Sequence, residues 1–434
     1  MQFKRYISHS DKKIEKVIRK LLDLHPKSID LSLGRIKKIL LKLGNPQNKI
    51  SNYIQVAGTN GKGSTSTILY NLQKAMGRKV HVYRSPHLLK LNERVIIANK
   101  QISNKYLLQI LEEVYFVNAG EKITFFEILT AAAFLAFSRS SADLVILEVG
   151  LGGRFDATNI IKKNLTSIIT TIGNDHKEFL GSDLSAIARE KAGIIKTNGK
   201  LIISKQKTIV NNILKEIAYD KNCKTYIYQK DWRVKGSNLY FKKNIINLKE
   251  LSLEGRHQYI NTSCAIISCL INKELHFNLD LLDDTIKRIT WQGRLQRVQG
   301  NLAKQYSSLK LWLDVAHNPL AFNILKDWII KKGIKNPIFI MAIGLNKDYI
   351  KIIQNLKKAN PYLVLLPKGL KLNAHDPNKI KKKCDALKIK CLVSENLDSA
   401  LKECEVSIGK RKNNNQVIIT GSFAIVSEAI SIDK

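Results

Sequence analysis

A glycine-rich segment that also holds a lysine and a serine is the clearest chemical signal in the sequence. Residues 58–64 read Gly-Thr-Asn-Gly-Lys-Gly-Ser and lie between an expected buried strand at 53–57 and an expected helix at 64–76. Glycines in such a turn let backbone N–H groups surround a phosphate, and the N-terminus of the following helix adds partial positive charge. The segment therefore predicts a phosphate-binding loop in which Lys62 reaches the outer phosphates.

This loop departs from the usual nucleotide-binding pattern. Val56 stands where the first glycine of that pattern would be, and Gly63 follows the lysine, so Ser64 comes one place late. A glycine-rich turn without a ligand is the plain alternative. We favour phosphate binding, because both a lysine and a serine follow the predicted strand. The expected loop residues are Gly58, Thr59, Asn60, Gly61, Lys62, Gly63 and Ser64.

Three polar residues at strand ends predict a magnesium site. Glu148 belongs to an apolar strand at 144–149, and a buried carboxylate is costly unless it is paired or holds a cation. His176 comes after an expected strand at 165–172, and Ser85 directly follows one at 79–84. Beside a nucleotide loop, Mg²⁺ is the expected partner of Glu148, with His176 and Ser85 as further ligands. An ion pair between Glu148 and Arg154 is the alternative.

Further candidates lie closer to the C-terminus. Asp314 and His317 stand at the end of an expected strand, and this acid and base suit work on a nucleotide or a phosphorylated intermediate. The Asn-Pro that follows them is also an ordinary helix start, so this segment alone leaves both interpretations open. Lys191 lies late on an expected helix, where a solvated side chain or an i,i+4 ion pair is the default.

Strands and helices alternate along the chain, which predicts an α/β fold with mostly parallel sheets. A second alternating series begins near residue 309, after a polar segment at 291–301 that holds two glycines. We therefore predict two domains, a P-loop mononucleotide-binding domain at 1–297 and a smaller Rossmann-like domain at 298–434. Ligands of such sheets bind at the carboxyl ends of strands, where the candidate residues fall. The remaining expected helices are 102–118 and 125–137, and the strands of the second series are 309–315, 337–343, 362–366 and 416–420.

Composition narrows the class of protein. The 434 residues include 72 Lys or Arg and 36 Asp or Glu, a net charge of +36. Such a charge attracts nucleic acids, but the lysines are spread along the chain and basic runs such as 381–383 lack aromatics, so we expect no dedicated nucleic-acid partner. No apolar run approaches the ~18 residues of a membrane span. A charged N-terminus without a signal peptide and six cysteines without a C-x-x-C pair favour a cytoplasmic protein with reduced thiols.

Ordered motifs between residues 33 and 423 together resemble those of the folylpolyglutamate synthase and dihydrofolate synthase family, within the Mur ligase superfamily. Many motifs in order are far more specific than any one of them. The matching segments are 33–36 (Leu-Gly-Arg-Ile), 58–64, 85–88 (Ser-Pro-His-Leu), 92–94, 124–127 (Thr-Phe-Phe-Glu), 148–159, 189–196, 293–294, 314–319 and 421–423.

The resemblance implies an ATP-dependent amide ligase. Such an enzyme activates a pterin-linked carboxylate as an acyl phosphate, and the amine of L-glutamate then displaces the phosphate. The implied substrates are ATP, L-glutamate, dihydropteroate and reduced folates, and the implied cofactor is Mg²⁺ as one or two ions, with a monovalent cation left open. We expect a monomer that uses both pterin substrates.

The resemblance also implies roles for individual residues. Lys62 and Ser64 would hold phosphates, while Ser85, Glu148 and His176 would ligate Mg²⁺. Lys191 matches a lysine that family members carry carbamylated as a further metal ligand. The positions that match ATP contacts are Asn261, Arg294, Asp314 and His317, and Arg294 is placed to offset charge on the transferring phosphoryl group. The expected catalytic set is Lys62, Lys191, Arg294 and His317, and Phe126 and Asp156 are expected to contact the pterin substrate.

Three departures from the family pattern leave the metal and phosphate residues intact. Ala424 stands where a histidine is common, Phe155 where leucine is usual, and Gln292 where proline is frequent. The nearest alternative is a folylpolyglutamate synthase without the dihydropteroate step. More distant alternatives are a Mur-type peptide ligase and a nucleotide- or nucleic-acid-binding protein without ligase activity.

Overall fold

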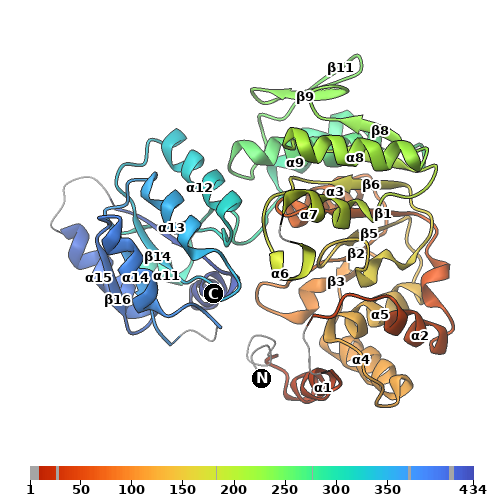
Figure 1. The fold of residues 1–434 in the computed structure, drawn as a ribbon, viewed down its shortest axis with the longest axis horizontal. Helices are drawn as coiled ribbons and strands as arrows, with labels where there is room; N and C mark the ends of the chain where they lie inside the picture. Colours follow the sequence, from red (N-terminus) through yellow and green to blue (C-terminus); the bar gives the residue numbers. More distant parts are fainter. Residues whose placement is uncertain (1–8, 26–28, 182, 276, 370–372, 410–414) are drawn as a thin grey trace.

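The computed structural model describes residues 9–25, 29–181, 183–275, 277–369, 373–409 and 415–434. They form two α/β bodies side by side, with the N-terminal body in red to green and the C-terminal one in blue (Figure 1). The predicted fold class is confirmed. In the part of the chain that the structure describes, no helix is both long and apolar enough to cross a membrane.

The N-terminal body is built on an eight-stranded sheet in the order β4-β3-β2-β5-β1-β6-β7-β8. The strands from β2 to β8 through β5 and β1 pair in parallel, while β3 and β4 continue the edge antiparallel. Its strands are β1 (Tyr53–Ala57), β2 (Val80–Tyr83), β3 (Val95–Ile97), β4 (Lys100–Gln101), β5 (Leu144–Glu148), β6 (Thr166–Ile169), β7 (Lys200–Ile203) and β8 (Lys224–Ile227).

Apolar residues alternate between the two faces of this sheet, and helices cover both. In β5, Leu144 and Ile146 pack with helices α3, α9 and α10, whereas Val145 and Leu147 pack with α1, α2, α4 and α5. Helices α7 and α8 cover the β6–β7 end. The helices are α1 (Lys12–Asp23), α2 (Gly34–Lys42), α3 (Lys62–Ala75), α4 (Asn104–Asn118), α5 (Phe125–Ser138), α6 (Lys177–Leu180), α7 (Leu184–Ala192), α8 (Thr208–Asp220), α9 (Arg256–Leu270) and α10 (Leu282–Lys287).

The C-terminal body has a six-stranded sheet in the order β12-β13-β17-β14-β15-β16, parallel except for β12. Its first strand, Gln296–Arg297, lies just before the predicted boundary at 297/298. The other strands are β13 (Lys310–Leu313), β14 (Ile338–Met341), β15 (Leu363–Pro367), β16 (Cys391–Ser394) and β17 (Gln416–Thr420). The helices are α11 (Asn301–Gln305), α12 (Pro319–Lys331), α13 (Tyr349–Lys357), α14 (Pro377–Ala386), α15 (Leu397–Gly409) and α16 (Phe423–Asp433).

A small antiparallel meander was not expected from the sequence. It comprises β9 (Trp232–Lys235), β10 (Asn238–Phe241) and β11 (Asn244–Asn247) and projects from the N-terminal body next to α8 and α9 (Figure 1). Its inward residues Trp232, Leu239 and Phe241 join the same apolar core as α3 and α9. Strands of only four residues show too little alternation to be recognised in a sequence.

Candidate active site

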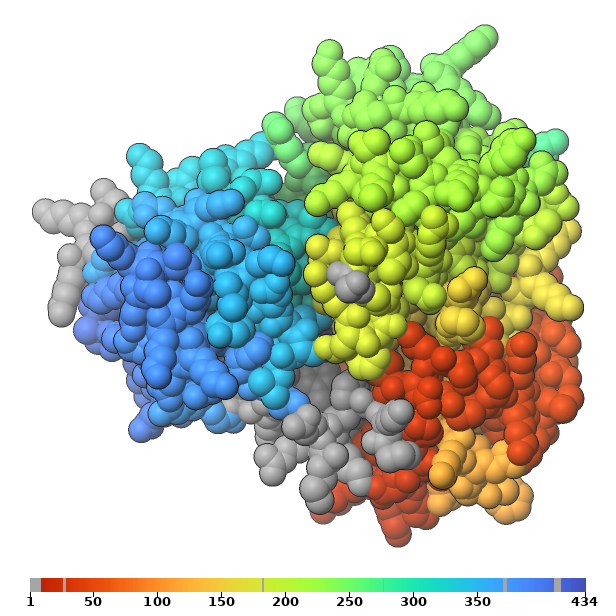
Figure 2. Space-filling view, viewed as in Figure 1, coloured from red at the N-terminus to blue at the C-terminus, as the bar shows by residue number. Residues whose placement is uncertain are grey.

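A cleft of about 1630 Å³ lies between the two bodies. Figure 2 shows the C-terminal domain, in blue, set against the yellow and green parts of the N-terminal domain. The cleft is lined by the loop 58–64, by the ends of β2 and β5, and by C-terminal segments at 314–317, 344–347 and 421–423. It thus lies at the carboxyl ends of strands from both sheets, as such folds lead one to expect.

Nearly all predicted site residues meet in this cleft. Those that line it are the loop residues Gly58 to Ser64 together with Ser85, Phe126, Glu148, Asp156, His176, Lys191, Arg294, Asp314 and His317. Asn261 does not line it but lies behind the loop, where its amide donates to Gln258 Oε1 at 2.9 Å.

The predicted phosphate loop joins β1 to α3 in a conformation that requires glycine at two places. Gly58 has φ +151°, and a Cβ there would lie 1.9 Å from Thr170 Oγ1. Gly61 has φ +91°, and a Cβ there would lie 2.6 Å from Asn261 Oδ1. Lys62 folds back over the loop, donating to the carbonyls of Gly58 at 3.1 Å and Thr59 at 3.3 Å. The loop is therefore packed closely from behind, and Lys62 lines the cleft while it bonds to the loop's own carbonyls.

Glu148, at the end of β5, is a buried carboxylate that no basic side chain of the described residues approaches within ion-pair distance. Burial raises its pKa to about 6, although the charges of Lys62, Arg84 and Arg294 act in the opposite direction. The predicted alternative partner, Arg154, is largely exposed and lies 4.0 Å from Glu190 instead. The hydroxyl of Ser85, beside this carboxylate, is buried without a hydrogen-bond partner.

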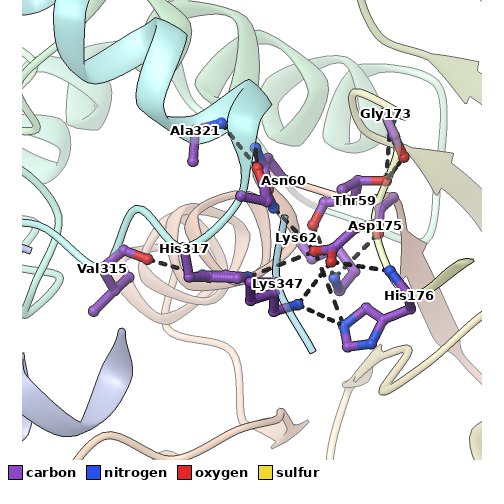
Figure 3. A network of polar contacts seen from close by, with 12 residues as sticks. Thr59, Asn60, Lys62, Gly173, Asp175, His176, Val315, His317, Ala321 and Lys347 are labelled. Carbon is purple, nitrogen blue, oxygen red and sulfur yellow. Dashed lines mark hydrogen bonds and ion pairs between the residues drawn. The ribbon is translucent and has the colours of Figure 1, made fainter. Parts of the chain in front are cut away.

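A second acidic centre, at Asp175, was not anticipated. This carboxylate accepts hydrogen bonds from Lys347 Nζ at 2.7 Å and Asn318 Nδ2 at 3.0 Å, and His317 Nε2 lies at 3.7 Å (Figure 3). Although burial alone would raise it, the interaction with His317 and the charges of Lys347 and His176 hold the pKa of Asp175 far below its usual range. The group joins the segment after β6 to the C-terminal domain.

His176, which the sequence predicted as a magnesium ligand, lies beside Lys347 in this structure. His176 lies at φ +50°, before α6, and its Nε2 is 3.2 Å from Lys347 Nζ. Its Nδ1 is buried without a partner, and burial together with the Lys347 charge lowers its pKa to about 3. Among the described residues, no three His, Cys, Asp or Glu side chains converge as a ready metal site. Glu148 and His176 both line the cleft.

Lys191 is not the solvated lysine that its helical position suggested. It lies in the last turn of α7 and is only 5% exposed. Burial and the nearby charge of Lys62 lower its pKa to about 7. At neutral pH a substantial fraction of this amine is therefore uncharged.

An arginine stacks on two aromatic rings where the linker, the segment 288–295 between α10 and β12, meets the C-terminal domain. The three residues are Arg294, Trp291 and Phe423. The Arg294 guanidinium lies 5.8 Å from the Trp291 ring centroid and 5.4 Å from that of Phe423. Nearby, Asp314 accepts from the backbone N–H groups of Leu295 and Ala316, both at 2.9 Å. Burial raises the pKa of Asp314 to about 6, against the lowering effect of Arg294.

The two predicted pterin contacts, Phe126 and Asp156, differ in how much of each side chain is left to contact a substrate. The ring of Phe126 packs against Gly150 and lines the cleft. The Asp156 carboxylate accepts hydrogen bonds from the backbone N–H groups of Gly150, Leu151 and Thr158, at 3.0, 2.9 and 2.9 Å. Asp156 therefore holds the shape of its own loop, and Phe126 presents an apolar surface.

Comparison with known proteins identifies the family. Residues 56–269 match the Mur ligase middle domain. The chain is 34% identical over 418 residues, 95% of each protein, to a Buchnera aphidicola dihydrofolate synthase/folylpolyglutamate synthase. The chain belongs to this family. The predicted resemblance, and with it the expected class of ATP-dependent ligase, is confirmed.

Solved structures of the family share the whole architecture. Mycobacterium tuberculosis folylpolyglutamate synthase complexed with ADP superposes with a TM-score of 0.87 at 26% identity, covering 97% of this chain and 99% of that one. Escherichia coli FolC in complex with DHPP and ADP gives a TM-score of 0.85 at 25% identity over 98% of this chain and 98% of that one.

The residues present also fit the divalent cation that the family implies. Two observations support the fit: Glu148 is a buried carboxylate that lacks a basic partner, and the Ser85 hydroxyl and His176 Nδ1 are buried without hydrogen bonds. Carboxylate and hydroxyl oxygens suit Mg²⁺. A cation near Glu148 would remove the penalty of burying that charge.

Proposed function

We propose that the chain is an ATP-dependent ligase that joins L-glutamate to dihydropteroate, giving dihydrofolate, and also to reduced folates, lengthening their glutamate tail. The observation that carries the proposal is one cleft that unites a phosphate loop, an unpaired buried carboxylate and the half-buried Arg294, in a chain 34% identical to a relative named for both activities.

The chemistry needs positioning and charge neutralisation more than a protein nucleophile. A carboxylate oxygen of the pterin substrate takes the γ-phosphoryl group of ATP, which leaves an acyl phosphate and ADP. The glutamate amine then attacks the acyl carbon, phosphate leaves, and the nitrogen loses a proton. In this proposal the N–H groups of the loop and Lys62 hold the phosphates, and Arg294 offsets the charge that develops on the transferring group.

Residues of the C-terminal domain would complete the nucleotide site. Asp314 and His317 face the same cleft as the loop, whereas Asn261 supports the loop from behind. Because the domains enclose the cleft, closure would exclude water and protect the acyl phosphate from hydrolysis.

Ser85, Glu148 and His176 would hold Mg²⁺. When bound, the ion neutralises charge on the β- and γ-phosphate oxygens. Whether a monovalent cation also binds stays a prediction.

Lys191 has the chemistry that carbamylation requires. An uncharged amine attacks CO₂ and loses a proton, which gives a carbamate with two oxygen atoms and a negative charge. The lowered pKa of Lys191 supplies the uncharged amine, and the modified side chain would add oxygen ligands to the metal site. Intact-protein mass spectrometry with and without bicarbonate would reveal the added mass of one CO₂, and Lys191→Gln should abolish it.

Phosphate release tests the proposed function. The enzyme is given ATP, Mg²⁺ and L-glutamate, with dihydropteroate and tetrahydrofolate in separate reactions. Release with both substrates is expected. Release with tetrahydrofolate alone would favour the folylpolyglutamate synthase alternative, and release with neither would contradict the proposal and favour a Mur-type or non-catalytic protein.

A further inference from the structure

Arg84 is a half-buried arginine of the cleft that no acidic side chain of the described residues approaches within ion-pair distance. It follows β2 directly and precedes Ser85, and its Nη1 donates to Thr67 Oγ1 at 3.2 Å. Its Nε is fully buried and has no hydrogen-bond partner. Because an unsatisfied donor and an unpaired charge are costly to bury, this side chain fits an anionic ligand better than a purely structural role.

The guanidinium of Arg84 is held in place by Trp291. It lies 5.0 Å from the indole centroid, while Arg294 lies 5.8 Å from the same ring. The indole in turn rests on the phosphate loop, because a Cβ at Gly63 would lie 3.0 Å from its Cζ2. Two cations thus share one aromatic ring beside the phosphate loop. Arg294 is on the side of Asp314, and Arg84 is on the side of Thr67.

Arg84 lines the cleft, and so do the polar side chains of Thr67, Tyr70, Asn71 and Gln101. Arg84 also lies close enough to Glu148 for each charge to shift the pKa of the other. An anion bound by Arg84 would therefore be near the place where the acceptor carboxylate is activated.

The two pterin substrates differ in one relevant group. Dihydropteroate carries a single carboxylate, the one that is activated. A folyl glutamate carries in addition an α-carboxylate, a few bonds from the γ-carboxylate that is activated. The folyl α-carboxylate is therefore a partner for a cation beside the activation site that dihydropteroate cannot offer, whereas a cation that binds the incoming L-glutamate would serve both reactions equally.

We propose that Arg84 binds the α-carboxylate of the folyl substrate and so determines how well the enzyme uses reduced folates relative to dihydropteroate. The proposal rests on the proposed function. It identifies a specificity residue for one of the two activities and leaves the phosphoryl chemistry to Lys62 and Arg294.

Steady-state kinetics of Arg84→Met with each pterin substrate tests the proposal. We expect kcat/KM for tetrahydrofolate to fall about 10- to 100-fold, mainly through KM, the size of a lost charged hydrogen bond. With dihydropteroate it should stay within about threefold of wild type. Arg297→Met is the matched control, because Arg297 also stacks on a tryptophan, Trp312 at 5.5 Å, but lies outside the cleft. It should leave both activities unchanged.

The outcomes separate this proposal from the proposed function. Equal losses with both substrates, or no loss with tetrahydrofolate, would overturn the role of Arg84 while the ligase activity stands. A wild-type enzyme inactive with both substrates would refute the proposed function itself. If Arg84→Met unfolds in a thermal melt, Thr67→Val provides the second test. This substitution removes only the hydrogen bond that orients the guanidinium, so it should lower kcat/KM for tetrahydrofolate and leave kcat/KM for dihydropteroate unchanged. An equal effect on both substrates would again overturn the proposal.

Discussion

Two buried carboxylates in the same cleft, Asp175 and Glu148, have opposite environments. Asp175 is met by Lys347 at 2.7 Å and by Asn318 at 3.0 Å, and its pKa is held far below the usual range. Glu148 has no such neighbour among the described residues, and burial raises its pKa to about 6. Side chains of the protein neutralise the charge of Asp175, whereas the charge of Glu148 is left for a bound metal cation.

The difference separates two tasks of the cleft. The partners of Asp175 come from the other domain, so this ion pair helps to hold the two domains together. Glu148 lies at the end of β5, near the loop 58–64 and the linker of the N-terminal domain. This is where the phosphates are proposed to bind. A charge that is already paired contributes to assembly, and a charge that is left unpaired contributes to ligand binding.

The largest effect is expected from Glu148→Gln. The substitution keeps shape and removes charge, so turnover should fall by about 10³-fold, as for loss of a main electrostatic group in an active site. The free energy of unfolding should stay equal or rise, because an unpaired buried charge is removed. Phosphate-release assays and urea unfolding measure the two quantities. Near-normal turnover would show that Glu148 has no part in the reaction.

Asp175→Asn should have the opposite profile in stability. It leaves Lys347 buried without a counter-charge, and we expect unfolding to become easier by about 3 kcal/mol, the usual cost of breaking a buried pair. Lys351→Met is the matched control: its exposed pair with Asp348, at 3.2 Å, should be worth no more than about 1 kcal/mol. A double variant with Lys347→Met should recover part of the loss. Equal effects of Asp175→Asn and the control would refute the distinction.

Asp314 predicts a pH dependence. Its folded pKa of about 6 lies above the ordinary aspartate value of about 3.9. Between these values the folded protein binds more protons than the unfolded chain, so this group lowers stability as pH rises from about 4 to about 6, by on the order of 2 kcal/mol. The free energy of unfolding of the wild type should therefore fall by this amount relative to that of Asp314→Asn as pH rises across the range. A difference that does not change with pH would contradict the assignment.

The smallest effect is expected from Arg154→Ala. Arg154 is 64% exposed and lies 4.0 Å from Glu190, away from Glu148. Turnover should change by less than about threefold, and stability by less than about 0.5 kcal/mol, as for an ordinary surface substitution. A loss like that of Glu148→Gln would instead support the ion pair between Glu148 and Arg154 that the sequence allowed.

The sequence was most informative where local pattern decides structure. The strand at 53–57 and the loop after it, and Glu148 at the end of its strand, follow from apolar runs and glycines. Asp175 and Lys347 could not be paired in advance, because 172 residues separate them and neither belongs to a motif that names the other. The role proposed for Arg84 likewise could not be predicted, because it depends on the contact with Trp291, which is distant in the sequence. Contacts between domains depend on tertiary placement, which periodicity does not encode.

Titration with Mn²⁺ in the presence of ADP, followed by electron paramagnetic resonance, tests the central distinction most directly. We predict that wild type and Asp175→Asn bind the ion with affinities within about threefold of each other, and that Glu148→Gln weakens binding by at least about tenfold. Undiminished binding by Glu148→Gln, with loss of binding in Asp175→Asn, would contradict the account and assign the cation to the other carboxylate.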